Sequence, residues 1–474
     1  MKIKFGTDGW RAIMAEDFTF ENVEKVVQAV ALYVKTLPKC KNGVVIGYDN
    51  RFLSEKFAAR CAEVLAGNDI NVLFYEKAVP TPVTAFATVV LKAAGALMLT
   101  ASHNPPEYNG IKFIPEYGGP ALPDVTDKIE AYLSEVDAGR EKIYKHSLKH
   151  AKELGLYEEI NIDETYITHL LNNIASQEFK NVNLKVVIDP MYGAGIGYLE
   201  DIFTRLNMPF SVLENWRDPL FGGKMPEPSA AVLTELREVV LAENADLGLA
   251  LDGDADRFGI IDSDGSFITP NEVLYLLYHH LLTYRKMHGP VARSVATTHL
   301  LDKIAERHNL KAEETPVGFK YIGQCLLKGT CILGGEESGG LSVSWHIPEK
   351  DGILAALLVS EIRAVNNKPL RTILAEQNAI YGAMVSTRLD VHVDPEQKIK
   401  IISKLENFVP ESIAGKRVVQ VNKIDGVKIS LEDGSWLLIR ASGTEPLFRL
   451  YVEAADEASL NSIQLDAKQI LSEH

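Results

Sequence analysis

GALMLTASHNPPEYNG, residues 95–110, joins a short apolar run to a polar loop. Residues 96–99 are apolar throughout, which predicts a buried strand of a mostly parallel sheet. The polar residues 100–104 cannot continue that strand, and Pro105 and Pro106 prevent a helix from starting at once. Ser102 is therefore expected on a loop at the carboxyl end of a strand, where open α/β sheets place their ligands.

The neighbours of Ser102 suit phosphoryl chemistry. His103 and Asn104 follow it directly, and Lys112 lies a few residues later, so these groups could position a phosphoryl group and move its protons. The alternative is a turn in which serine and asparagine only bond their own backbone. The rest of the chain favours the first interpretation.

Strand and helix patterns alternate through most of the chain, which is typical of wound α/β sheets. Expected strands include 44–48, 72–75, 184–188, 247–251, 291–297 and 331–333. Polar, weakly periodic segments at 137–165 and 364–380 are interpreted as boundaries. The last hundred residues instead indicate antiparallel strands with covering helices, a smaller α+β domain. The predicted domains are 1–150, 151–262, 263–375 and 376–474.

Composition limits the function. The 474 residues are 46% hydrophobic and 24% charged, as in ordinary globular proteins, and no apolar run approaches the ~20 residues that span a bilayer. The net charge of −15 argues against nucleic acid and anionic membranes as partners. Four cysteines without a CxxC pair, and no signal-peptide pattern, lead us to expect a cytoplasmic protein.

The segment DGDADR, residues 252–257, predicts a metal site. Three aspartates at alternate positions repel one another unless a cation neutralises them, and their oxygens suit Mg²⁺ or Ca²⁺. An EF-hand loop is excluded because its sixth position is Arg257 instead of glycine and its twelfth is Ser263 instead of glutamate. Few ligands from one short loop fit Mg²⁺ held jointly with a phosphate.

Two further loops could bind a sugar phosphate. GGEESGG, residues 334–340, is flexible and rich in acceptors, as a polyhydroxylated ligand requires. RASGTEP, residues 440–446, with Arg449 beyond it, combines arginines, hydroxyls and a glycine in a pattern that suits a phosphate cradle. For the first loop, a solvated acidic turn is the alternative.

Together, FGTDGWR, TASHNP, DGDADR, GEESGG and RASGTEP resemble the α-D-phosphohexomutases, in this order and over essentially the whole chain. The resemblance implies three similar α/β domains with mostly parallel mixed sheets and a smaller fourth domain around a central cleft. It implies sugar-phosphate substrates, one Mg²⁺ per chain, catalytic traces of glucose 1,6-bisphosphate as activator, and a monomer or homodimer.

The resemblance also assigns roles. Ser102 would carry the phosphoryl group and, with Asp252, Asp254 and Asp256, hold Mg²⁺. The groups around the reacting phosphoryl would be Arg11, His103, Lys112 and Arg257, with Lys112 as the candidate base. The sugar would contact Gly318, Glu336, Ser338, His346 and Lys350. The second phosphate would contact Arg440, Ser442, Gly443, Thr444 and Arg449.

One departure bears on the substrate. Mannose- and glucosamine-type members often end the sugar loop with histidine, whereas this chain has Gly340, and Glu337 supplies a second carboxylate. Both features are similar to the glucose-type enzymes, so a phosphoglucomutase is expected. The alternatives are a phosphomannomutase or dual-specificity mutase, a sugar-phosphate phosphatase, and a catalytically silent sugar-phosphate-binding protein.

Overall fold

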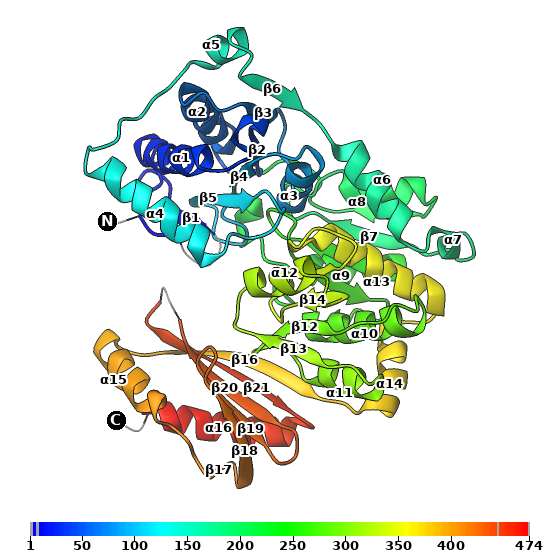
Figure 1. Cartoon of the computed structure of the whole chain (residues 1–474). Helices are drawn as coiled ribbons and strands as arrows, with labels where there is room; N and C mark the ends of the chain where they lie inside the picture. The colour runs from blue at the N-terminus through cyan, green and yellow to red at the C-terminus, as the bar shows by residue number, and fades with distance from the viewer. Residues whose placement is uncertain (1–2, 6–8, 443–444, 473–474) are drawn as a thin grey trace.

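The computed structural model describes residues 3–5, 9–442 and 445–472, and these residues form four successive sheets. In Figure 1 the first sheet and its helices, in blue and cyan, lie at one end of the molecule, and the fourth, in orange and red, lies at the other. The second and third lie between them. The expected architecture of three α/β units and a smaller α+β unit is confirmed.

The first sheet is mixed. Its strands in spatial order are β1 (Trp10–Ile13), β5 (Tyr108–Pro115), β4 (Gly95–Leu99), β2 (Val44–Tyr48), β3 (Val72–Tyr75) and β6 (Tyr157–Ile160). Its helices are α1 (Phe20–Lys35), α2 (Ser54–Gly67), α3 (Thr81–Val90), α4 (Pro123–Asp137) and α5 (Leu148–Glu153). The neighbouring strands β4, β2, β3 and β6 pair in parallel. Strand β5 pairs antiparallel with both of its neighbours, β1 and β4.

Strand β6 extends the first sheet beyond the predicted boundary at residue 150. It pairs in parallel with β3, and its sequence YEEI is mostly polar. An edge strand can leave much of its surface to solvent, so it needs no apolar pattern. For this reason the polar segment 137–165 gave no sign of a strand.

The second and third units repeat the α/β plan. The second sheet has the order β11 (Phe267–Ile268), β10 (Phe258–Asp262), β9 (Leu247–Leu251), β7 (Val186–Asp189) and β8 (Phe210–Val212). Its helices are α6 (Asp163–Asn173), α7 (Ser176–Phe179), α8 (Tyr198–Arg205) and α9 (Thr234–Glu243). The third sheet has the order β13 (Ala312–Thr315), β12 (Val291–Ser294), β14 (Leu333–Gly335) and β15 (Leu341–Val343). Its helices are α10 (Pro270–Thr283), α11 (Leu300–Arg307), α12 (Phe319–Leu327), α13 (Gly352–Asn366) and α14 (Leu370–Tyr381).

Helix α14 lies where the sequence predicted a boundary at 364–380. Its residues Leu370, Ile373 and Leu374 are buried, and it packs against α10 and α11. The exposed side of the helix carries the polar residues that made the segment resemble a linker. The predicted boundary after residue 375 therefore falls inside a helix of the third unit.

The fourth unit is an antiparallel sheet. Its strands in spatial order are β16 (Val385–His392), β21 (Leu447–Ala454), β20 (Trp436–Ala441), β19 (Val427–Leu431), β18 (Lys416–Asn422) and β17 (Ser412–Ile413). Helices α15 (Pro395–Glu406) and α16 (Glu457–Ser472) contribute to a core of its own. The predicted hairpins at Asp425 and Asp433 join β18 to β19 and β19 to β20.

One apolar core runs from α3 of the first unit through the second and third units. Helix α13 lies within it, and every residue from Gly352 to Ala364 is buried. A helix that is apolar on all sides belongs inside a protein. Its buried Glu361 is paired: it accepts hydrogen bonds from His280 Nε2 (2.7 Å), Arg285 Nε (2.7 Å) and the backbone N–H of Ala175 (2.8 Å). No helix in the described part of the chain is long and apolar enough to cross a bilayer.

We predict that Glu361→Ala lowers the free energy of unfolding by about 3–5 kcal/mol, because it removes one partner of a buried charged cluster. Urea denaturation at pH 7 measures the change. Glu164→Ala is the matched control, because Glu164, like Glu361, accepts hydrogen bonds from an arginine, here Arg205, but is exposed. This control should lower the free energy of unfolding by less than about 1 kcal/mol. Equal losses in the two variants would contradict the prediction.

The same cluster predicts a pH dependence. Burial raises the pKa of Glu361, but His280 and Arg285 outweigh it and lower the pKa to about 2. A lowered folded-state pKa contributes stability above the unfolded pKa of about 4.3, and that stability is lost as the pH falls. The difference in the free energy of unfolding between the wild type and Glu361→Ala should therefore become smaller as the pH falls from about 4 toward 2.

Candidate active site

Ser102 lies directly after β4, as expected, in a strained backbone conformation. Its φ is +52°, and only 1% of its surface is exposed. Its Oγ donates a hydrogen bond to Asp252 Oδ2 (2.9 Å), and His103 Nδ1 lies 3.4 Å from the same oxygen. The structure therefore joins the predicted serine to the predicted metal loop.

The buried side chain of Arg51 binds the backbone of the Ser102 loop. Arg51 was not among the predicted site residues. One guanidinium nitrogen donates to the carbonyls of Ser102 (2.5 Å) and Asn104 (2.6 Å). The other donates to the carbonyls of Pro105 (2.8 Å) and Tyr108 (3.0 Å). The side chain is fully buried beside Asp49, whose Oδ2 lies 3.3 Å from Nε. A left-handed conformation at a serine persists only where such contacts fix the backbone.

The three aspartates of the predicted metal loop gather at one point. Their side chains are fully buried, and one oxygen from each lies within 4.8 Å of the others. Among the described residues, Asp254 Oδ1 and Asp256 Oδ1 have no hydrogen-bond partner. Burial, and then Asp254 and Asp256, raise the pKa of Asp252 well above its ordinary value. Buried, unpaired carboxylate oxygens in this arrangement fit a divalent cation such as Mg²⁺.

Cations from two other units reach this cluster. Lys112, on β5, places Nζ 3.0 Å from Asp254 Oδ2 and 3.1 Å from Asp256 Oδ2. Lys350, just before α13, places Nζ 2.7 Å from Asp256 Oδ2. Thr81, at the start of α3, donates to Asp254 Oδ2 (2.6 Å). Side chains from the first three units therefore meet at the metal loop.

The remaining predicted groups around Ser102 are cationic or neutral. Arg11 on β1 donates to Asn104 Oδ1 (2.9 Å), and Arg257 lies 3.5 Å from Glu227 Oε1. Burial, followed by Arg257 and Arg11, holds the pKa of His103 far below its ordinary value. His103 is therefore neutral at pH 7, beside Ser102.

The sugar loop is the tight turn between β14 and β15. Glu336 accepts a hydrogen bond from the backbone N–H of Gly318 (2.7 Å), which joins two predicted sugar-binding residues. Burial, and then Glu337, raise the pKa of Glu336 to about 7. Ser338 is exposed at the tip of the loop.

Gly340 leaves room for Lys350. A Cβ added at Gly340 would lie 2.4 Å from Lys350 Cδ and 2.7 Å from Cγ. A larger side chain at the end of the sugar loop would displace the lysine stem. The glycine that distinguishes this chain from histidine-type members therefore allows Lys350 to reach Asp256.

His346 does not lie in the site, contrary to the prediction that it contacts the sugar. Its side chain has no exposed surface, and its Nε2 lies 2.8 Å from Asp351 Oδ2. The ring packs among aromatic side chains of the first two units. The sequence around His346 is rich in loop residues, and it did not indicate that the His346 side chain points into the core.

The predicted phosphate cradle lies on the fourth sheet. Arg440 on β20 is the register partner of Arg449 on β21, and Ser442 follows the end of β20. Arg440 Nε donates to Asp425 Oδ1 (2.9 Å), while Asp425 Oδ2 accepts from the backbone N–H of Val317, beside Gly318 (3.0 Å). Asp425 thus ties the cradle to the third unit. Gly443 and Thr444 lie outside the described residues.

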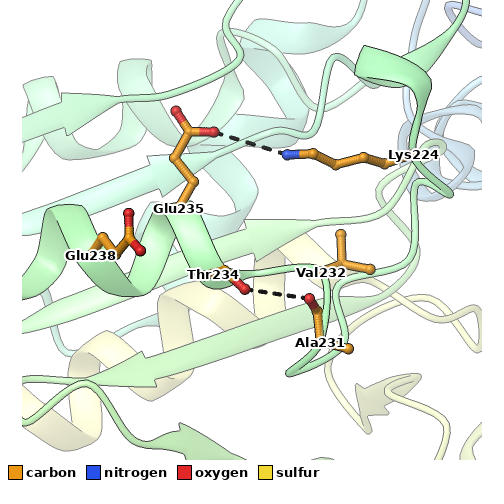
Figure 2. Close-up of a pocket in the computed structure, with 6 residues that line it drawn as sticks. All are labelled: Lys224, Ala231, Val232, Thr234, Glu235 and Glu238. Carbon is orange, nitrogen blue, oxygen red and sulfur yellow. Dashed lines mark hydrogen bonds and ion pairs between the residues drawn. The ribbon is translucent and has the colours of Figure 1, made fainter.

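A separate pocket of about 540 Å³ lies at the start of α9, away from these residues (Figure 2). Lys224 and Glu235 form an ion pair across it (3.9 Å). The residues that line it are Lys224, Ala231, Val232, Thr234, Glu235 and Glu238. No predicted site residue is among them, and we assign this pocket no role.

Arg51 and Thr81 were missed, although a signal for both exists. Arg51 belongs to the polar triplet that follows β2, and Thr81 follows β3. The carboxyl ends of neighbouring parallel strands meet at one edge of a sheet, so polar residues there could have been grouped with Ser102.

Comparison with known proteins gives one consistent result. Four domain families match successive parts of the chain: phosphoglucomutase/phosphomannomutase α/β/α domain I (2–140), domain II (164–265), domain III (269–381) and the C-terminal domain (391–469).

Relatives match along nearly their full length. A phosphoglucomutase/phosphomannomutase of Thermococcus kodakarensis is 32% identical over 96% of this chain and 95% of its own. A phosphoglucosamine/phosphogalactosamine mutase of Sulfurisphaera tokodaii is 28% identical over 98% of each chain. A crystal structure of the phosphoglucomutase parafusin from Paramecium covers 99% of this chain and 94% of its own, with 25% identity and a TM-score of 0.83. The chain thus belongs to the phosphoglucomutase/phosphomannomutase family, the α-D-phosphohexomutases.

Proposed function

We propose that this phosphohexomutase is a magnesium-dependent phosphoglucomutase, which interconverts glucose 1-phosphate and glucose 6-phosphate through a phosphorylated Ser102 and a sugar 1,6-bisphosphate. The observation that carries the proposal is the hydrogen bond from Ser102 Oγ to Asp252, within a cluster that also receives Lys112 and Lys350. Phosphoryl transfer needs in-line positioning and neutralisation of charge, and this cluster is suited to both.

The metal would be held by Asp252, Asp254 and Asp256, with a phosphoryl oxygen on Ser102 as a further ligand. Bound Mg²⁺ would offset the negative charge of the transferring phosphoryl group. Lys112, in contact with two of the carboxylates, and Arg257 would offset the rest. Arg11 would bind the phosphoryl oxygens from the side of β1.

Two half-reactions would transfer the phosphoryl group. In the first, the bond between phosphorus and Ser102 Oγ breaks as O6 of glucose 1-phosphate attacks; a base of the enzyme takes the O6 proton, and Ser102 Oγ gains a proton. The bisphosphate then turns over in the site. In the second, Ser102 Oγ loses its proton and attacks the phosphorus on O1, the bond between phosphorus and O1 breaks, O1 gains a proton, and glucose 6-phosphate leaves. Lys112 stays the candidate proton carrier. His103 lies 3.4 Å from Oγ, but its pKa is held far below its ordinary value, so it would not keep a proton at pH 7.

Binding of the rest of the substrate would use both ends of the site. Glu336 and Ser338 would accept and donate hydrogen bonds to the sugar hydroxyls, beside Gly318 and Lys350. Arg440, Ser442, Gly443, Thr444 and Arg449 would bind the phosphate that does not react. A phosphatase would not need this second phosphate site, which favours the mutase.

The preference for glucose rests on the sugar loop. Gly340 leaves the space that the Lys350 stem fills, in place of a loop-end histidine, and Glu337 is present. Family relatives include phosphoglucomutases and hexosamine phosphate mutases, so the sugar itself has to be tested.

Phosphorus NMR tests the function directly. The glucose, mannose and glucosamine 1-phosphates would be supplied at equal concentration with Mg²⁺ and a trace of glucose 1,6-bisphosphate. We expect glucose 1-phosphate to be converted fastest to its 6-phosphate, without inorganic phosphate. Chelation of Mg²⁺ and the Ser102→Ala change should each abolish conversion. Faster conversion of another sugar would overturn the glucose preference, and release of inorganic phosphate alone would indicate a phosphatase.

A second prediction concerns Arg51. Arg51→Lys keeps the buried charge beside Asp49 but cannot donate to four carbonyls at once. Because a displacement of about 1 Å at a catalytic group can cost roughly 100-fold in rate, kcat should fall about 100-fold. KM should change little, since Arg51 lies beneath the loop.

Arg205→Lys, at an exposed pair with Asp201 and Glu164, is the control and should leave both constants unchanged. Steady-state kinetics measures them. A kcat within threefold of wild type in Arg51→Lys would show that the loop does not depend on the guanidinium.

A further inference from the structure

A buried chain of hydrogen bonds runs from the second unit to the segment that carries Lys350. His169 Nε2, on α6, lies 3.1 Å from His346 Nδ1, and His346 Nε2 lies 2.8 Å from Asp351 Oδ2. Tyr166, also on α6, donates its hydroxyl to the same Asp351 oxygen (2.6 Å). The side chains of His346 and Asp351 have no exposed surface.

The hydrogen bond to Asp351 has a fixed direction. A carboxylate only accepts, so His346 Nε2 carries the proton that it donates to Asp351. His346 Nδ1 shares the other hydrogen bond with His169 Nε2. The stack of Phe86, from α3, against the His346 ring holds the ring in place, with centroids 6.0 Å apart. The chain therefore holds Asp351 from the first and second units.

Asp351 in turn fixes the start of α13. Its other oxygen, Oδ1, accepts the backbone N–H of Leu354 (2.9 Å), an N-cap of the helix. Its own N–H donates to the carbonyl of Leu341 (3.0 Å), at the end of the sugar loop. A side chain held by three donors leaves little freedom to the residues on either side.

Both neighbours of Asp351 contact the metal loop. Lys350 Nζ lies 2.7 Å from Asp256 Oδ2, and the backbone N–H of Gly352 donates to the carbonyl of Ala255 (3.1 Å). The contact at Gly352 is close, because an added Cβ would lie 2.3 Å from the carbonyl oxygen of Arg257. Any shift of Asp351 would therefore move the metal loop or Lys350.

We propose that His346 is a positioning residue for the reaction: with His169 and Tyr166 it fixes Asp351, and through Asp351 it sets the geometry of Lys350 and the metal loop. The effect on catalysis rests on the proposed function, whereas the effect on the metal loop does not. Residues that orient metal ligands or their neighbours typically change metal affinity or activity 10–100-fold when altered.

The test compares four variants. His346→Phe keeps the aromatic packing and removes both hydrogen bonds, while His346→Gln places an N–H donor where Nε2 was. His279→Phe is the matched control, because His279 also bonds a neighbour, Tyr381 (2.9 Å), but lies on α10 away from the metal loop. Asp256→Asn changes a predicted metal ligand directly, and shows how far Mn²⁺ binding and kcat fall when the metal loop itself is altered.

Three quantities are measured on each full-length variant: the Kd for Mn²⁺ by electron paramagnetic resonance, the Tm of the metal-free protein, and kcat and KM. We expect His346→Phe to weaken Mn²⁺ binding and lower kcat about tenfold or more, and His346→Gln to recover both to within threefold. His279→Phe should leave Mn²⁺ binding and kcat unchanged even if its Tm falls.

The proposal is overturned if His346→Phe and His279→Phe have the same Kd for Mn²⁺ and the same kcat, or if His346→Gln recovers Tm without recovering them. Either result would make His346 a packing residue only. Absence of mutase activity in the wild type would overturn the proposed function instead, and the Mn²⁺ comparison would still decide the role of His346.

Discussion

The guanidinium of Arg51, buried beneath the Ser102 loop, is the contact on which the site depends. It binds four backbone carbonyls of residues 102–108 and lies 5.0 Å from the centre of the Phe221 ring of the second unit. Burying a cation is costly unless it is paired and hydrogen bonded. Here Asp49 supplies the opposite charge, and the loop carbonyls accept from the two terminal nitrogens, while Nε has no hydrogen-bond partner among the described residues. These contacts fix the loop so that Ser102 keeps a left-handed backbone conformation, which serine rarely adopts.

Charge explains why three units must come together. The metal loop contains three buried carboxylates, which repel one another. Lys112 from the first unit and Lys350 from the third offset this negative charge. The largest apolar core spans the same three units, so packing and charge fix the same geometry. The fourth unit has its own core. It joins the third unit through polar contacts, such as Glu314 with Lys428 (2.8 Å) and Asp425 with the backbone of Val317, and through a small buried apolar cluster. The cluster consists of Val295, Ala296, Trp436, Leu438 and Tyr451. Such an interface resembles those between separate domains.

The sequence predicted many helices and strands because their apolar patterns are strong. It singled out the three aspartates because carboxylates at alternate positions repel one another without a cation, and Ser102 because its polar loop follows an apolar strand. It missed β6 and α14, which lie at the edge or on the surface and keep polar faces. It also predicted no helix over α13, whose residues are buried on all sides and so show no amphipathic pattern. Arg51 and Thr81 were missed because the polar residues that follow different strands were not grouped with Ser102, although parallel strands bring such residues to one edge of a sheet. His346 was wrongly placed at the sugar, since sequence spacing does not reveal that its ring turns inward toward Asp351.

The central claim is that Ser102 carries the phosphoryl group that the protein transfers. Peptide mass mapping after incubation with Mg²⁺ and glucose 1,6-bisphosphate that carries isotope-labelled phosphates tests it, followed by a chase with excess unlabelled glucose 1-phosphate. The account predicts that the peptide containing Ser102 gains one labelled HPO₃ group, and that during the chase an unlabelled group replaces it while the label moves to glucose 6-phosphate. A labelled group on another residue, or a labelled group that stays on Ser102 through the chase while glucose 6-phosphate accumulates, would contradict it.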